Sequence, residues 1–190
     1  MEEALRGQDI INKKDRWTIA GAPNGTYTTD WFRDCMESFK TMGQIQQNFW
    51  NKWVAKKVNI FIWCLLKEHI PTRQKLCDMG MDIPSTICPL CDTLEEDITH
   101  LFFDCSKVAD LWQNFSVWWS ENVPRVSRAE DLFVWTWQTK RSEKDCRILQ
   151  VAIIAVLYSI WRVRNGVVFE KKKMEVERVF RNAQELAFFG

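Results

Sequence analysis

The chain has 190 residues, of which 46% are hydrophobic and 27% are charged, a balance typical of a globular protein and not of a disordered one. Its 26 basic and 25 acidic residues leave a formal net charge of +1, which excludes a uniformly basic nucleic-acid binder. Any contact with nucleic acid must therefore come from a local basic patch. The 11 Trp and 12 Phe residues predict a packed core, or a large apolar surface that meets a partner.

Cysteine usage and the first residues indicate an intracellular protein in a reducing compartment, either the nucleus or the cytoplasm. The seven cysteines are an odd number, and residues 1–6 lack the apolar centre of a signal peptide. The most apolar run, 148–158, is interrupted by Gln150 and is too short to span a bilayer. It predicts a buried helix, so no membrane partner is expected.

The first half of the chain predicts helices after a polar lead-in. Residues 1–44 form this lead-in, with a short extended piece at 25–29 and a helix that begins at Asp30. Residues 45–69 have helical periodicity, Pro71 ends that helix, and Thr72 can cap a short helix that ends at Gly80. The apolar stripe of the 45–69 segment consists of Trp50, Trp53, Val54, Val58, Phe61, Ile62, Leu65 and Leu66.

The most informative motif is Cys88, Cys91, His100 and Cys105, spaced C-x2-C-x8-H-x4-C. Three thiols and one imidazole are the ligands of a closed, tetrahedral Cys3His zinc site. A closed site leaves no position for water or substrate, so the motif predicts structural Zn²⁺ and not metal catalysis. Cys77 is the best substitute ligand, although a core position suits it better.

The second half predicts further helices around this motif. Thr93-x-x-Glu96 has capping-box spacing and predicts a short helix that carries His100. Ser106 can cap the next helix, whose inner face holds apolar residues from 108 to 115. Residues 125–141 are interpreted as a charged connector around an apolar island, 132–135. Ser142 begins a long helix to about Arg164, which Asn165-Gly166 would end, and a last amphipathic helix begins near residue 171.

Several of these residues follow one another in the order of a known family. They are Trp53, Lys57-Val58, Phe61, Trp63, Pro71-Thr72, Leu76, Gly80, Cys88-x-x-Cys91, His100-Leu101, Cys105 and Trp112. The segment resembles the zinc-binding domain downstream of the reverse transcriptase in LINE-type (non-LTR) retrotransposon polyproteins, most densely over 50–113. Trp161-x-x-Arg164-Asn165-x-x-Val168-Phe169 is similar to a frequent tail motif of that family. The sequence has no Tyr-x-Asp-Asp motif, so the resemblance implies an accessory module and not an enzyme.

The resemblance implies a mostly α-helical multi-helix domain with a zinc-stabilised Cys3His knuckle and few or no short strands. Three regions are expected: the lead-in at 1–44, the zinc-binding domain at 45–124, and a connector with a C-terminal helical pair at 125–190. The implied partners are RNA, DNA, or the polymerase lobe or another protein, with no small-molecule substrate. Candidate nucleic-acid contacts are the basic residues near the first long helix: Lys52, Lys56, Lys57, Lys67, Arg73 and Lys75.

Each functional interpretation has a structural alternative. The basic residues could form an ordinary solvated helix face, because Glu68 and Asp78 interrupt them. The tryptophans could stack on bases, but Trp53, Trp63, Trp112 and Trp161 have the helical spacing of core residues. The near-neutral charge favours a competing function, a structural or protein-interaction module without nucleic-acid affinity, whether a domesticated protein or a relic fragment.

Overall fold

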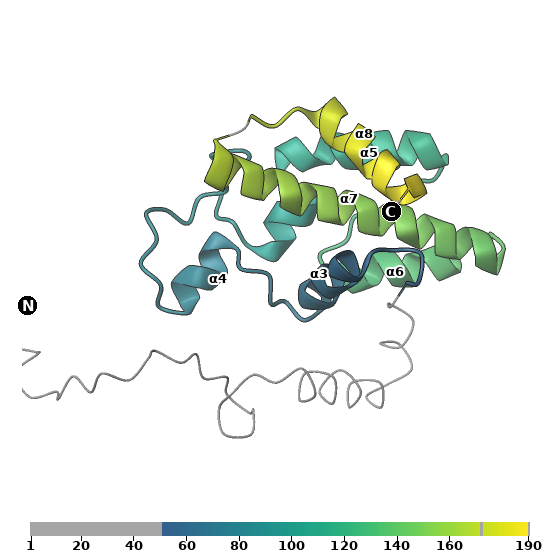
Figure 1. Ribbon diagram of the computed structural model, residues 1–190, viewed down its shortest axis with the longest axis horizontal. Helices are drawn as coiled ribbons and strands as arrows, with labels where there is room; N and C mark the ends of the chain where they lie inside the picture. Colours follow the sequence, from purple (N-terminus) through teal and green to yellow (C-terminus); the bar gives the residue numbers. More distant parts are fainter. Residues whose placement is uncertain (1–50, 172, 190) are drawn as a thin grey trace, which may run out of the picture. The chain divides into compact units, whose positions relative to one another are not determined.

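The computed structural model describes residues 51–171 and 173–189, and these ranges contain helices and no strand (Figure 1). Within them, an antiparallel bridge between Ile87 and Glu95 is the only β pairing. The mostly α-helical fold is therefore confirmed, whereas the helix expected from Asp30 lies outside the described residues. The elements are α3 (Lys56–Leu66), α4 (Arg73–Asp78), the π-helix η4 (His100–Asp104), α5 (Ser106–Trp119), α6 (Ala129–Gln138), α7 (Glu143–Glu170) and α8 (Val176–Phe189).

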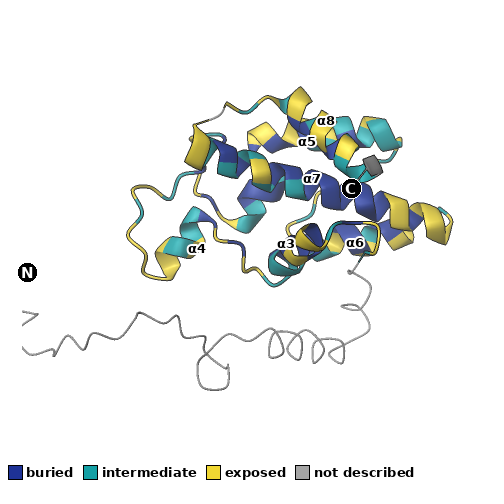
Figure 2. Cartoon of the chain, viewed as in Figure 1, coloured by how far each residue is buried: buried dark blue, intermediate teal, exposed yellow. Residues whose placement is uncertain are grey.

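Helix α7 is the centre of the fold. It contacts α3, α5, α6, α8 and η4, and in Figure 2 its middle turns are coloured as buried. By length and composition α7 could cross a membrane, but 67% of its most apolar window is buried inside the protein. That is the environment of a core helix, so the expectation of a buried helix at 148–158 is confirmed. The domain boundary expected at 124 stays a prediction, and helices from both sides of it share one core.

The apolar stripe before α3 does not continue the helix. Helix α3 begins at Lys56, and residues 51–54 instead form a turn around the buried side chain of Asn59. The Asn59 amide donates to the carbonyl oxygens of Asn51 and Val54 at 2.9 and 3.0 Å, and its oxygen accepts the Asn51 N–H at 3.0 Å. Because this turn satisfies a buried amide, it is favoured over a further helical turn. Trp53 is 42% exposed, which corrects its expected place in the core.

The C-terminal half differs from expectation at three helix boundaries. The expected connector at 125–141 contains α6, whose buried residues Ala129, Leu132, Phe133 and Thr136 have helical spacing. Helix α7 continues through the buried Gly166 to Glu170, because packing against α8 outweighs the roughly 1 kcal/mol cost of an interior glycine. Helix α8 accordingly begins at residue 176 instead of near 171.

A buried ion pair joins the segment before η4 to α7. Two oxygens of Glu96 accept hydrogen bonds from Nε and Nη2 of Arg164, each at 2.7 Å. The exposed fractions of the two side chains are 0% and 4%. Glu96 also accepts the backbone N–H of Arg73 at 2.9 Å, so the same carboxylate holds the start of α4. The Arg164 guanidinium lies 5.0 Å from the ring centroid of Trp161, which covers it.

We expect Glu96→Ala and Arg164→Ala each to lower the free energy of unfolding by about 3–5 kcal/mol, because each leaves one buried charge without its partner. The double variant Glu96→Leu, Arg164→Met should recover part of this loss, because it removes both charges. The matched control is Arg147→Ala, which breaks an exposed pair with Glu143 and should change stability by about 0.5 kcal/mol or less. Urea unfolding in the presence of zinc measures the free energy of unfolding of all four variants. Equal losses of stability in Glu96→Ala and Arg147→Ala would contradict the prediction.

Candidate metal centre

The first two ligands lie on a tight turn between α4 and η4. The backbone N–H of Cys88 donates to Leu94 at 2.7 Å, and the N–H of Asp92 donates to Cys88 at 2.9 Å. Asp92 has φ 55°, a left-handed conformation that Asp tolerates better than most residues. The bridge between Ile87 and Glu95 closes the base of this turn. The turn therefore presents the Cys88 and Cys91 thiols on the same side, as the C-x2-C spacing predicted.

The last two ligands are fixed by the ends of η4. Asp97, and not Thr93, caps this segment: its Oδ1 accepts the N–H of His100 at 2.6 Å. The capping box expected at Thr93-x-x-Glu96 is wrong, because Glu96 is committed to Arg164. At the other end, the N–H of Cys105 donates to the His100 carbonyl at 2.7 Å, and Cys105 is also the N-cap of α5. Asp97-x-x-His100 has N-cap spacing, which could have located this helix start.

The four side chains converge on one point. One ligand atom from each of Cys88, Cys91, His100 and Cys105 lies within 4.8 Å of the others. Cys91 Sγ and His100 Nε2 are 3.3 Å apart. Tetrahedral zinc with Zn–S bonds of about 2.3 Å holds its sulfurs about 3.8 Å apart, so a small contraction of this cluster satisfies the geometry. The arrangement can hold a metal ion with protein ligands alone.

Burial and neighbouring donors suit thiolate ligands. Cys88 and Cys105 are fully buried, His100 is 7% exposed, and the adjacent Leu101 and Phe102 lie in the core. The Thr93 hydroxyl donates to Cys91 Sγ at 3.1 Å. Such donors orient metal-bound thiolates and stabilise their charge. Cys77, the alternative ligand, is exposed on α4 and is not part of the cluster, which also corrects its expected core position.

The protonation of the four ligands is coupled. The hydrogen bond with Cys105, together with burial, raises the pKa of Cys88 well above its usual range, and the same contact lowers the pKa of Cys105. Burial opposes ionisation of Cys91, but hydrogen bonds from Thr93 and neighbouring backbone groups outweigh it and lower the pKa. Burial also opposes protonation of His100, but contacts with Cys91 and Cys88 outweigh it and raise its pKa. A dication that binds here displaces the shared protons.

The predicted basic residues do not form one strip. Lys52, Lys56 and Lys57 are exposed at the start of α3, where Lys52 Nζ lies 5.9 Å from the ring centroid of Trp53. The Arg73 side chain instead donates to the Ile87 carbonyl and ties α4 to the metal-binding turn. Lys67 is half-buried and also has an interaction partner.

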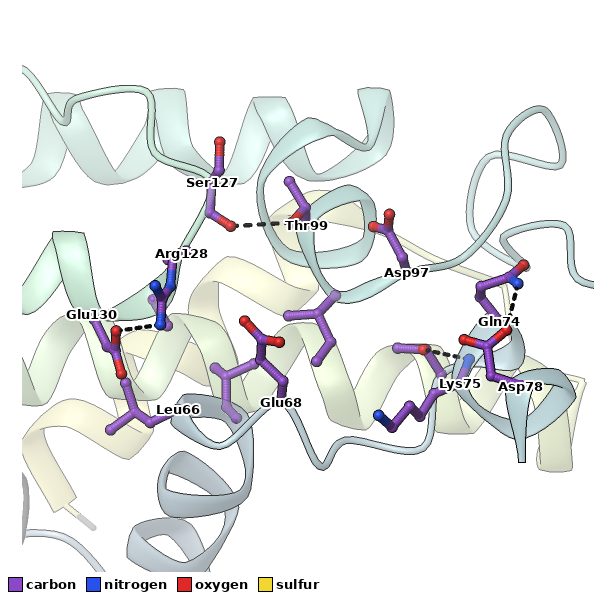
Figure 3. Close-up of a pocket in the computed structure, with 14 residues that line it drawn as sticks. Leu66, Glu68, Gln74, Lys75, Asp78, Asp97, Thr99, Ser127, Arg128 and Glu130 are labelled. Atoms are coloured by element: carbon purple, nitrogen blue, oxygen red, sulfur yellow. Dashed lines mark hydrogen bonds and ion pairs between the residues drawn. The ribbon is translucent and has the colours of Figure 1, made fainter.

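Lys75 lines a cleft beside the candidate metal centre, with both apolar and charged lining residues (Figure 3). The cleft has a volume of about 320 Å³ and lies between α4, the end of α3, residues 97–99 and the start of α6. Its charged lining consists of the carboxylates Glu68, Asp78, Asp97 and Glu130 and the cations Lys75 and Arg128. The excess of carboxylates repels phosphate, so this face is a poor surface for nucleic acid.

A comparison with known protein families agrees with the metal centre. Residues 28–112 match the family model described as zinc-binding in reverse transcriptase. All four candidate ligands lie inside this match, which begins upstream of the described residues and ends within α5. No curated protein and no solved structure matches the chain. The family is an accessory domain and not a catalytic one, which is consistent with a non-enzymatic role. The segment from residue 28 to residue 112 is therefore similar to the zinc-binding domain of reverse transcriptases.

Proposed function

We propose that this domain is a zinc-stabilised accessory module of a LINE-type reverse transcriptase and that it contacts RNA or DNA. The family match and the Cys3His cluster support the zinc-binding part of this proposal. The ordered motifs from Trp53 to Trp112 support the LINE-type origin. Since all ligand positions of a tetrahedral ion would be filled by protein, the ion has no site for substrate, and its role is to hold the fold.

Zinc is the metal that these ligands favour. Three soft thiolates and one imidazole select Zn²⁺ over hard cations, which prefer oxygen. Cys88 and Cys91 lie on the turn, whereas His100 and Cys105 bracket η4 and lead directly into α5. The ion would therefore fix the turn to α5, and its binding free energy would contribute to folding.

The nucleic-acid contact is best placed at the start of α3. We define the α3 patch as Lys52, Trp53, Lys56 and Lys57. Among the described residues, α3 has no side-chain cap and no acidic residue in its first turn, yet Lys56 and Lys57 occupy that turn. Cations at a helix N-terminus oppose the helix dipole, so this placement costs stability. A phosphate would offset that cost by accepting hydrogen bonds from the first N–H groups of the helix and by neutralising the lysines.

The exposed Trp53 ring adds a stacking surface to the patch. It is 42% exposed and follows Lys52 directly, so a base can stack on the ring while its phosphate contacts a lysine. Arg73 and Lys67 are not part of the patch, because both of them have other contacts in the structure. Lys75 is also excluded, because it faces the carboxylate-rich cleft of Figure 3.

A protein-interaction module is the second candidate. The specific observation in its favour is the carboxylate-rich cleft beside the metal centre, which would accept a basic segment of a partner more readily than a phosphate. The polymerase lobe is one such partner. The two candidates differ in a measurable property, because only the first predicts affinity for single-stranded RNA or DNA, with the salt dependence of counterion release.

The metal is tested by elemental analysis of the full chain. We expect one zinc per chain, with loss of far-UV helical signal and of cooperative unfolding after chelation, because ligand geometry and folding are coupled. Cys88→Ser with Cys91→Ser should abolish metal binding. Cys77→Ser is the matched control and should retain zinc, because Cys77 is exposed and outside the cluster. A metal-free double variant with wild-type stability would refute a structural ion.

The α3 patch is tested by titrating single-stranded RNA and DNA at several salt concentrations. We expect Lys56→Ala with Lys57→Ala to weaken binding and to reduce the slope of log affinity against log salt by about 1.4, or roughly 0.7 for each phosphate that a lysine had neutralised. Lys140→Ala with Lys144→Ala is the control, because both side chains are exposed, neither belongs to the patch, and Lys144 also lies in a first helical turn. Binding without salt dependence would favour the protein-interaction function.

A further inference from the structure

A groove between the C-terminal half of α7 and the start of α8 combines cations, amides and an exposed aromatic ring. Its volume is about 350 Å³. Helix α7 contributes Arg162, Asn165 and Phe169, which recur at helical spacing on one face, and α8 contributes Arg178 and Asn182 one turn apart. Figure 1 shows α8 returning alongside α7 after the connector that carries Lys173. The groove lies outside the part of the chain that matches the family model.

The cations in this groove have no partner among the described residues. Arg162, Lys173 and Arg178 form no hydrogen bond or ion pair there, although Glu170 and Glu175 line the same groove. Arg164 is only two residues from Arg162, yet it is buried and paired with Glu96. The tail motif therefore has two faces: Arg164 points into the core, and its neighbours line the groove. Packing explains the position of Arg164, but it gives the residues that line the groove no structural role.

Local composition sets this region apart from the rest of the chain. Besides Arg164, residues 162–182 contain six basic and three acidic side chains, whereas the whole chain is nearly neutral. The N-terminus of α8 adds positive potential at the same place. The Asn182 amide has no hydrogen bond among the described residues, and the Asn165 oxygen accepts only from Arg164 there, at 3.1 Å. The groove thus offers donors to an anion and amides to a base edge.

Phe169 is the second unexplained feature. Its side chain is 75% exposed at the edge of the groove, so it contributes little to the core. An exposed ring beside two guanidinium groups is the arrangement that binds single-stranded nucleic acid, in which bases stack on aromatic faces and cations follow the backbone. A double helix does not offer its base faces for such stacking, because they are paired and stacked within the duplex.

We propose that this groove binds a single-stranded nucleic-acid segment, with one base stacked on Phe169 and phosphates held by Arg162 and Arg178. The inference rests on the proposed nucleic-acid function and deepens it by adding a second contact surface beyond the family-matched segment. An anionic lipid surface suits the groove less well. The apolar face of α8, which includes Val179 and Ala183, is already buried against the core, so residues 176–187 of the helix, whose side chains the structure describes, offer no free apolar stripe to insert into a bilayer.

The first test measures binding of fluorescent oligouridylate and oligodeoxythymidylate to the full chain. Phe169→Ala should weaken binding by about 5- to 150-fold, the range expected for loss of one stacked base. Arg162→Ala with Arg178→Ala should reduce the salt slope by about 1.4. Val117→Ala is the matched control for Phe169, because Val117 is 76% exposed on α5, and it should bind as the wild type does. The ratio of the two affinities shows which of the two polymers the protein prefers.

The second test locates the contact directly. Oligouridylate carrying 5-iodouridine, irradiated in complex with the protein, should crosslink to Phe169, as mapped by mass spectrometry. The crosslink should persist in Lys56→Ala with Lys57→Ala, so failure of the α3 patch and failure of the groove are distinguishable. Wild-type affinity and salt slope in both groove variants would overturn the inference. The inference would also be overturned if the protein bound vesicles rich in anionic lipid but no oligonucleotide, and if Phe169→Ala abolished that vesicle binding.

Discussion

The buried ion pair between Glu96 and Arg164 is the contact on which the arrangement of this protein depends. The two residues are 68 positions apart, and their side chains have almost no exposure, so each charge is stable inside the core only while the other is present. Glu96 immediately precedes Asp97, which caps the segment that carries His100. The same carboxylate accepts the first N–H of α4. One residue therefore fixes the metal-binding segment relative to both α4 and the central helix.

The Cys3His cluster and this ion pair join residues at different separations along the chain. The four candidate ligands lie close together along the chain, so an ion bound to them would organise only the turn, η4 and the start of α5. The ion pair connects that local unit to α7, around which α3, α5, α6 and α8 pack. This division explains why α7 has to extend past Asn165 and Gly166. A helix that ended there would lose the last turns that pack against α8 and that carry Phe169 to the groove.

The two proposed binding surfaces consist of side chains that the core leaves exposed. At the start of α3, lysines oppose the helix dipole and Trp53 is exposed, whereas Trp112 donates its Nε1–H to the Phe102 carbonyl and serves packing. In the α7–α8 groove, arginines without a partner in the described part of the chain lie beside an exposed ring. Residues that break a local rule without a structural gain are the expected markers of a binding site. The charge of the cleft beside the candidate metal centre has the opposite sign, because carboxylates outnumber cations in its lining.

The sequence by itself identified the four candidate metal ligands, because Cys88, Cys91, His100 and Cys105 are close along the chain and their spacing favours a local turn. It also determined α4 and the start of α7, since the caps Thr72 and Ser142 act within one turn. Only the tertiary structure decided the outcome for residues whose partners are distant. Glu96 forms an ion pair with Arg164 instead of capping a helix. The Arg73 side chain donates to the Ile87 carbonyl, and Gly166 lies within α7 instead of ending it. In each case the energy came from a contact between segments that the chain order does not place together.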